Sequence, residues 1–248
     1  LELFIARRIA HNGSGNRPGV MVRIAVVAVA LSVTVMILAL AVIMGFKREI
    51  TDRVTGFSAQ VEVADLRSAG SIESVPVPRS EQLERAIRSA GEVVRLAPYA
   101  VKGGVVKTPD AILGVMLKGV DGGYDWSFFR DHLLEGELPR VGDSIRTKEI
   151  LISRSVAREM GLVPGDKVEM LFVESEKSPR RDRFKVSGIY ATGMDEFDRS
   201  VAMTDLRNVQ RLADWSSEEV SGYEVTLADF SQAEDFSRRL NDMLLDSD

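Results

Sequence analysis

One short basic run holds the residue types best suited to recognising another molecule. The segment ESEKSPRRDR places a proline among closely spaced cations: Lys177, Pro179, Arg180, Arg181 and Arg183. Proline stiffens the backbone, and each guanidinium presents a fork of N–H donors that suits carbonyl and carboxylate groups. The run is therefore a candidate binding site, although most charge runs are solvated loops. The residues alone leave both interpretations open.

Other candidate sites have weaker patterns. The isolated residues His11 and His132 have no ligand spacing and are expected to be structural or solvated. Asp195, Glu196 and Asp198 do not match an EF-hand, so an exposed turn is favoured over a cation site. The sequence has neither a G-x-x-x-x-G-K-[ST] loop nor a nucleophile elbow. We predict no catalytic residue, no metal site and no cofactor.

Charge and cysteine content limit the remaining classes. The 248 residues carry a net charge of −5 and no cysteine. Arg7, Arg8, Arg17 and Arg23 outweigh Glu2 before residue 24, so the first 23 residues have a net charge of +3 and the remainder −8. An acidic remainder gives no sign of nucleic-acid binding. Disulfides and thiolate metal sites are excluded.

An uncharged stretch, Ile24 to Phe46, is the element that positions everything else. As a helix it would be roughly 35 Å long, enough to cross a hydrocarbon core of about 30 Å. The arginine-rich N-terminal flank predicts a cytoplasmic N-terminus and an exported C-terminal region. A cleaved signal peptide ending near Ala39-Leu40-Ala41 is the alternative. The apolar run continues beyond that point, which favours an uncleaved anchor.

The residues before this stretch have helical periodicity. Leu1, Phe4, Ile5 and Ile9 share one face, which predicts a short interfacial elbow helix with Arg7 and Arg8 near anionic headgroups. A disordered tail with chance periodicity remains the alternative. The flexible turn HNGSGNRPG then leads into the span.

The region after residue 57 mixes strands and helices without strict alternation, which predicts an α+β fold. Ser80 and Ser153 are expected helix N-caps, and Gly161 is an expected helix end. We predict helices following Ser80, Ser153 and Asp229, and at Tyr124–Phe129 and Asp205–Ala213. The expected strands are Ala59–Val63, Val93–Ala97, Val101–Lys107, Ala111–Val120, Glu149–Ser153, Val168–Val173, Phe184–Ile189, Val201–Thr204 and Gly222–Leu227.

An ordered set of motifs gives the chain a family resemblance. FIARRIA precedes the span, and RLAPYAVKGGVVK, GVMLKGVD, LLEGELP, EILISRSVAREMGLVPGDKVEML and FKVSGIYATGMDEFDRSVAMTDLRNVQRL follow it. The set resembles permease subunits of the lipoprotein-releasing ABC transporter, of LolC/LolE type. More broadly, it is similar to permeases with a MacB-like periplasmic core and an FtsX-like membrane domain.

The resemblance implies an inner-membrane subunit with four spans, of which this chain holds the first, so we expect a fragment. The implied divisions are an elbow at residues 1–19, a span with a periplasmic extension at 20–56, and a MacB-like periplasmic domain at 57–248. That domain would consist of a Porter-like core with an inserted Sabre-like subdomain. The implied partners are an ATPase, a second permease subunit, membrane lipids, a lipoprotein substrate and its periplasmic carrier.

The resemblance also implies roles for particular residues. The hairpin formed by Val168–Val173 and Phe184–Ile189 would be a hook that recruits the carrier, with its tip in ESEKSPRRDR. Within the span, Met36, Leu40, Ile43 and Met44 suit a surface that receives acyl chains. A plain lipid-facing anchor is the alternative for the span. A LolC-like or LolE-like role, a MacB-type efflux, mechanotransmission or cell-division permease, and a signal-anchored interaction module without transport all remain open.

Overall fold

The computed structural model describes residues 18–57, 59–68, 74–109, 111–142, 144–174, 177–194 and 198–245. The predicted elbow residues Phe4, Arg7 and Arg8 lie outside the described residues. The chain separates into two compact units, Leu1–Val54 and Thr55–Asp248, which are described separately below.

The first unit is dominated by one long helix, α2, at Pro18–Phe57. Its segment Gly19–Phe46 is long and apolar enough to cross a membrane. The hydroxyl of Thr34 donates to the carbonyl of Ala30 at 2.7 Å, which satisfies this polar group within the helix. The helix continues without a break beyond Phe46, as the sequence predicted.

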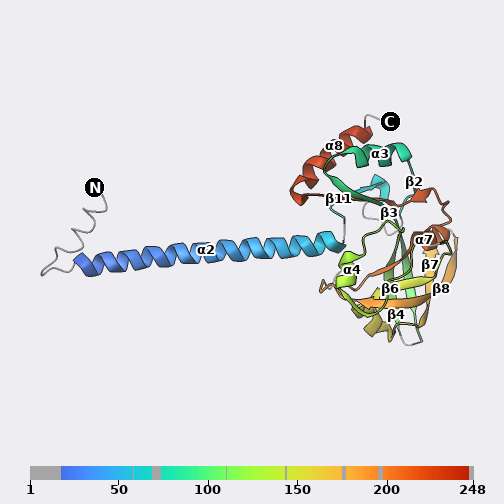
Figure 1. The fold of residues 1–248 in the computed structure, drawn as a ribbon. Coiled ribbons are helices and arrows are strands. Elements are labelled where there is room, and N and C mark those ends of the chain that lie inside the picture. The colour runs from blue at the N-terminus through green and yellow to red at the C-terminus, as the bar shows by residue number, and fades with distance from the viewer. Residues whose placement is uncertain are drawn as a thin grey trace. The chain divides into compact units, whose positions relative to one another are not determined.

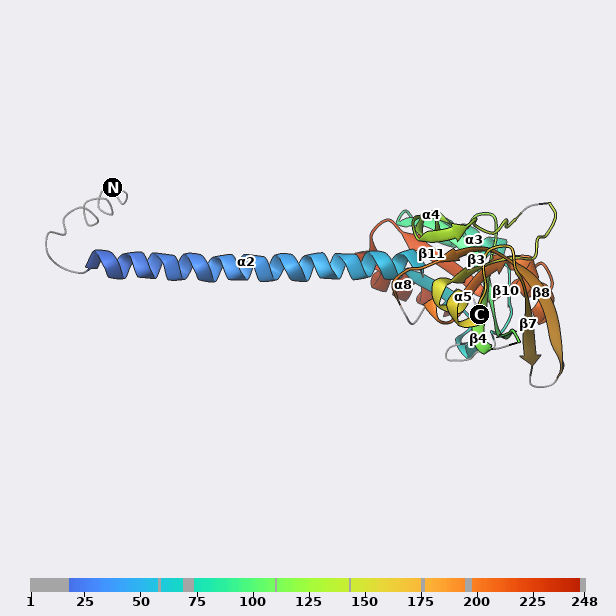
Figure 2. The same ribbon diagram turned by 90° about the horizontal axis from the view of Figure 1, so that it is seen from below.

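The second unit is an α+β domain with one large sheet (Figures 1 and 2). Figure 1 shows α3 and α8 at one end of this domain and β4, β6, β7 and β8 at the other. Its strands are β1 (Val61–Ala64), β2 (Val77–Pro78), β3 (Val93–Lys107), β4 (Ile112–Val120), β5 (Leu133–Gly136), β6 (Glu149–Ser153), β7 (Lys167–Glu174), β8 (Lys177–Tyr190), β9 (Val201–Asp205), β10 (Glu219–Val220) and β11 (Gly222–Leu227). Its helices are η1 (Leu66–Ser68), α3 (Glu81–Ser89), α4 (Ser127–Asp131), α5 (Arg154–Met160), α7 (Leu206–Ala213), η2 (Phe230–Gln232) and α8 (Ala233–Leu245).

The large sheet runs in the order β1-β11-β3-β4-β9-β6-β8-β5. Strand β7 pairs with both β8 and the second half of β3. The pairings β3–β4, β4–β9, β9–β6, β6–β8, β8–β7 and β7–β3 therefore close a ring of strands. Outside the ring, β1 and β11 come from the two ends of the domain sequence and β5 comes from its middle, whereas the middle of the sequence supplies most of the ring.

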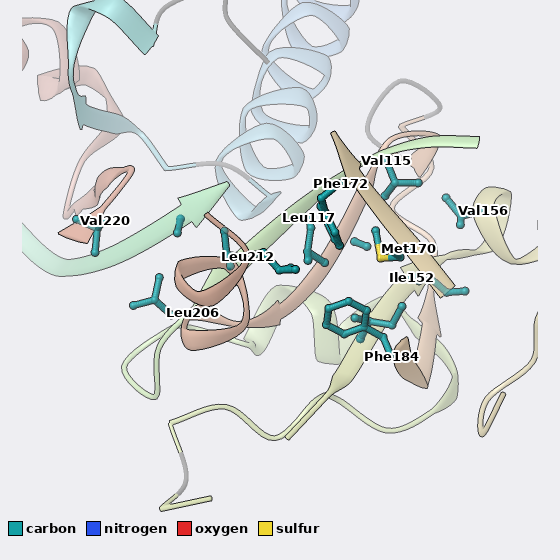
Figure 3. Close-up of a cluster of buried hydrophobic side chains, with 14 of the residues drawn as sticks. Val115, Leu117, Ile152, Val156, Met170, Phe172, Phe184, Leu206, Leu212 and Val220 are labelled. Carbon is teal, nitrogen blue, oxygen red and sulfur yellow. The ribbon is translucent and has the colours of Figure 1, made fainter. Parts of the chain in front are cut away.

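Apolar side chains fill the ring and continue under the adjoining sheet. Phe172, Phe184 and Met170 are at most 1% exposed, and all three come from the β7–β8 pair (Figure 3). Strand β3 passes directly over one of them, because a Cβ at Gly104 would lie 2.6 Å from Cε1 of Phe172. Only glycine fits at position 104 without movement of the Phe172 side chain. A second, smaller cluster contains Phe129 and Tyr190.

Several predicted helix boundaries are confirmed. The hydroxyl of Ser80 accepts from the Leu83 amide at 3.2 Å, and that of Ser153 accepts from the Val156 amide at 3.1 Å. Helix α5 ends at Gly161, whose φ of 65° is the left-handed conformation that favours glycine. These local signals predicted α3 and α5 correctly because each cap satisfies an amide that the helix leaves unpaired.

Other expectations were wrong in detail. Residues 93–107 form one strand rather than two, and Pro98 lies within it. Proline is tolerated there because pairing with β4 starts only at Tyr99, which leaves β3 paired on one side at Pro98. The aromatic helix α4 begins at Ser127 rather than Tyr124. The short strands β2, β5 and β10 were not predicted.

Candidate functional site: the β7–β8 hairpin

Strands β7 and β8 form the antiparallel hairpin that the sequence predicted, but the hairpin is longer than expected (Figure 2). Pairing continues from Lys167–Lys185 to Glu174–Lys177. The basic run was expected to form a loop, whereas most of it belongs to β8. Its cations therefore alternate between the two faces of a strand.

The inward face of β8 attaches the hairpin to helix α7. One guanidinium nitrogen of Arg180 donates to the carbonyl of Arg211 at 3.1 Å, and another forms an ion pair with Asp214. Asp214 follows the last turn of α7 and has a left-handed φ of 59°. These contacts assign Arg180 a role within the domain, unlike its neighbours on the opposite face of β8.

Asp182, next but one to Arg180, is the centre of this inward attachment. Its side chain is only 6% exposed and forms ion pairs with Lys148 and Arg211. Burial and the nearby cations Arg211 and Arg146 lower the pKa of Lys148. Sequence reasoning did not identify Asp182, because the run around it is basic. Strand alternation was the available signal, since it places Asp182 and Arg180 on the same face.

The outward face of β8 carries the exposed part of the candidate site. The side chains of Arg181 and Arg183 are 70% and 76% exposed. Both approach Glu169 on β7, at 3.8 Å and 3.6 Å. Pro179 is also exposed, whereas the side chain of Lys177 lies outside the described residues. Because one carboxylate faces two exposed guanidiniums, donors remain available to an external acceptor.

The predicted lipid-facing residues lie on α2. Met36, Ile43 and Met44 are 62%, 62% and 66% exposed, and Leu40 is 45% exposed. Other apolar residues of this helix, such as Val42 at 69%, are equally exposed. The helix alone therefore does not distinguish the predicted face from its other sides.

The weaker sequence candidates have structural contacts. The expectation of an exposed turn was wrong for Asp198, which is buried and accepts hydrogen bonds from the amides of Thr192 and Gly193 and from the Thr192 hydroxyl. Asp195 and Glu196 lie outside the described residues. His132 stacks on Phe128, and its Nδ1 lies 2.8 Å from the Phe128 carbonyl. No cluster of three or more His, Asp or Glu suited to a metal occurs in the part of the chain that the structure describes.

Comparison with known sequences places these features in a wider context. The family described as MacB-like periplasmic core domain matches residues 24–243. The lipoprotein-releasing system transmembrane protein LolC of Xylella fastidiosa strain 9a5c is 28% identical over 224 residues, covering 84% of this chain and 50% of that protein. LolC of Neisseria meningitidis serogroup B is 26% identical over 201 residues, covering 77% of this chain and 45% of that protein. The chain thus spans about half the length of these relatives.

Solved structures with a related arrangement are more distant in sequence. The periplasmic region of MacB from Actinobacillus actinomycetemcomitans aligns with a TM-score of 0.48 and 13% identity, covering 74% of this chain and 79% of that one. The extracellular domain of the transporter YknZ from Gram-positive bacteria aligns with a TM-score of 0.45 and 16% identity, covering 71% and 86%.

Proposed function

Because the chain belongs to the family of MacB-like periplasmic core domains, we propose that it is part of a permease subunit of a lipoprotein-releasing ABC transporter. In this proposal a separate ATPase hydrolyses ATP, and a second permease subunit completes the membrane complex. The substrate is a lipoprotein in the inner membrane, and a periplasmic carrier receives it. The N-terminus is cytoplasmic and the α+β domain is periplasmic. The similarity to two LolC proteins favours a LolC-like over a LolE-like role.

The observation that carries this proposal is the outward face of the β7–β8 hairpin. It offers Pro179, Arg181 and Arg183 to solvent on a paired two-stranded support. A rigid support reduces the entropy lost when a partner is bound, and guanidinium forks bind carbonyls and carboxylates with defined geometry. We assign the recognition of the carrier to this face. Arg180 is a positioning residue that holds the hairpin on α7.

A charge-reversal experiment tests this assignment. The double variant Arg181→Glu/Arg183→Glu should weaken carrier binding by about tenfold or more, because like charges then meet at the interface. The measurement is titration of the purified carrier against the full chain in detergent. The matched control reverses two exposed arginines that lie outside the hairpin, Arg130→Glu on α4 and Arg158→Glu on α5. Undiminished binding by the hairpin variant would show that the exposed arginines are merely solvated and do not recognise the carrier.

The continuity of α2 supports a second part of the proposal, which is mechanical coupling between span and domain. The helix extends from Pro18 to Phe57, and the boundary between the two compact units falls within it, after Val54. An unbroken helix transmits displacement better than a flexible linker does. We propose that the extension after Phe46 conveys motion driven by the partner ATPase to the periplasmic domain.

Insertion of three glycines between Lys47 and Thr51 tests the coupling. Lipoprotein release from membranes containing the full transporter should be lost, because glycine makes this part of the helix flexible. ATP hydrolysis should remain largely intact, since the ATPase is a separate subunit. Insertion of three alanines is the control for flexibility, because alanine preserves the helix. Unchanged release in the glycine variant would exclude a rigid lever.

The remaining assignments extend the same proposal. Met36, Leu40, Ile43 and Met44 would contribute to the cavity that receives acyl chains, because flexible methionines fit irregular lipid. The strands from both ends of the domain sequence would form the Porter-like core, and the middle of the sequence would form the inserted Sabre-like subdomain. The hairpin belongs to this middle part.

A further inference from the structure

A concave and strongly basic surface lies at the base of the hairpin and includes Arg183, one of the two arginines assigned to the carrier. The cavity has a volume of about 480 Å³. We name it the basic groove, and its charged lining consists of Arg140, Lys148, Lys167, Arg183, Lys185 and Glu149. An adjoining cavity of about 460 Å³ shares Arg140, Glu149 and Lys185. Five cations thus surround one carboxylate, in a chain whose net charge is −5.

The only carboxylate in the charged lining is already neutralised. Oε1 of Glu149 lies 2.9 Å from a guanidinium nitrogen of Arg140, and Oε2 accepts from the Arg140 amide at 2.9 Å. Partial burial raises the pKa of Glu149, but the bonds from Arg140, with smaller contributions from the charges of Arg140 and Lys185, outweigh it and leave the pKa below its ordinary value. Lys148 is paired with Asp182 on the inward side of the hairpin.

The two remaining lysines oppose each other across the hairpin. Lys167 on β7 and Lys185 on β8 are direct partners in the antiparallel register, and both side chains are exposed. Like charges in this position destabilise a strand pair, so their placement opposes stability. In the described part of the chain, neither ammonium group has a carboxylate within ion-pair distance. The pair therefore offers ammonium donors that no ion pair within the described residues occupies, although the charge of Lys185 also acts on Glu149.

We infer that the basic groove binds a phosphate-bearing anion through Lys167 and Lys185. A phosphate monoester carries about −1.5 to −2 charges on three acceptor oxygens. It can therefore engage two lysines on neighbouring strands at once, which a single carboxylate does less well. Lysine binds phosphate as a point charge and needs no planar fork. The concavity suits a compact ligand rather than a flat protein surface. Two sources share this chemistry: a lipid headgroup and a soluble phosphate compound.

The inference is independent of the proposed carrier site because it depends on lysines that were not assigned to the carrier. Because Arg183 also lines the groove, the single variant Arg181→Glu separates the two sites, and loss of carrier binding in it would leave the phosphate inference unaffected. Conversely, loss of phosphate binding in a lysine variant would leave carrier recognition to be judged by its own experiment. The two proposals therefore fail separately.

The experiment uses inorganic pyrophosphate titrated calorimetrically into the full chain in nanodiscs of zwitterionic lipid. We expect saturable binding that weakens at high ionic strength. The variant Lys167→Gln/Lys185→Gln should lose affinity by about tenfold or more. The matched control, Lys107→Gln/Arg130→Gln, removes the same charge at other exposed positions and should bind as the parent does. Thermal unfolding of the lysine variant should be unchanged or shifted upward, because the like-charge pair is relieved.

Competition distinguishes the two sources. Vesicles containing phosphatidic acid should displace pyrophosphate if the ligand is a lipid headgroup, and should leave it bound if the ligand is soluble; both results support the phosphate site. Absence of saturable binding by the parent would overturn the inference, as would equal binding by the lysine variant. Binding of a hexaglutamate peptide in place of pyrophosphate would also overturn it, since the groove would then recognise an acidic protein segment.

Discussion

Two charged regions of the domain use the same residue types in opposite ways. Around Lys118, charges are buried and paired: its ammonium group lies 2.5 Å from Glu224 and 5.8 Å and 5.7 Å from the ring centres of Tyr99 and Tyr124. Around Lys185, cations are exposed and outnumber the carboxylates. The comparison shows that location, rather than residue type, separates charges that support the fold from charges available to a ligand.

A hydrogen bond from β3 to β1, two strands along the sheet, completes the contacts of the Lys118 region. The hydroxyl of the buried Tyr99 donates to the carboxylate of Glu62 on β1. Burial and the nearby Glu62 charge both raise the pKa of Tyr99, which keeps the phenol protonated. Every charge in this region therefore has a partner within the domain, in contrast to the lysines of the basic groove.

The substitution Lys118→Met should have the largest effect on stability. The side chains of Lys118 and Glu224 are 11% and 13% exposed, so Glu224 would become a buried charge without its cation. We expect a loss of about 3 kcal/mol in the free energy of unfolding, measured with urea. The double variant Lys118→Met/Glu224→Leu should recover most of it, because the unpaired charge is removed. An equal loss in both variants would contradict the pairing argument.

Asp182→Asn should have an intermediate effect. The aspartate is buried, but its partners Lys148 and Arg211 are 43% and 47% exposed and water screens them once the carboxylate is gone. We expect a loss of about 1–2 kcal/mol in the free energy of unfolding. The control Arg181→Ala, on the opposite face of β8, should change stability by less than about 0.5 kcal/mol. Similar losses of stability in both variants would contradict the assignment of a buried, structural face and an exposed face to β8.

The smallest change in the free energy of unfolding should come from protonation of Asp125 at low pH. Burial would raise the pKa of Asp125, but the Ser127 amide and Arg95 hold it at about 2. A depressed pKa contributes stability above the ordinary aspartate value and loses it as the pH falls toward the folded value. Because this side chain is 43% exposed, we expect less than about 1 kcal/mol. The stability difference between the parent and Asp125→Asn should shrink as the pH falls and vanish below a pH of about 2. A constant difference would contradict this assignment.

Local signals in the sequence were sufficient for much of the fold. Ser153 and Gly161 predicted both ends of α5, since a cap and a left-handed end depend only on neighbouring residues. The strands β6 and β11 were predicted with their observed bounds. The existence of a hairpin around the basic run was also predicted. The length of the hairpin was not predicted. The charged residues of the run are typical of a loop, but cross-strand pairing extends through them.

The sequence by itself determined the uncharged stretch at Ile24–Phe46, the capped helices and the presence of clustered cations. Tertiary structure alone decided the partners of Arg180 and Arg181, the closure of β7 onto β3, and the juxtaposition of Lys167 with Lys185. The reason is range. A helix cap or a membrane span depends on adjacent residues, whereas strand register and the partners of a buried charge depend on segments far apart in the chain.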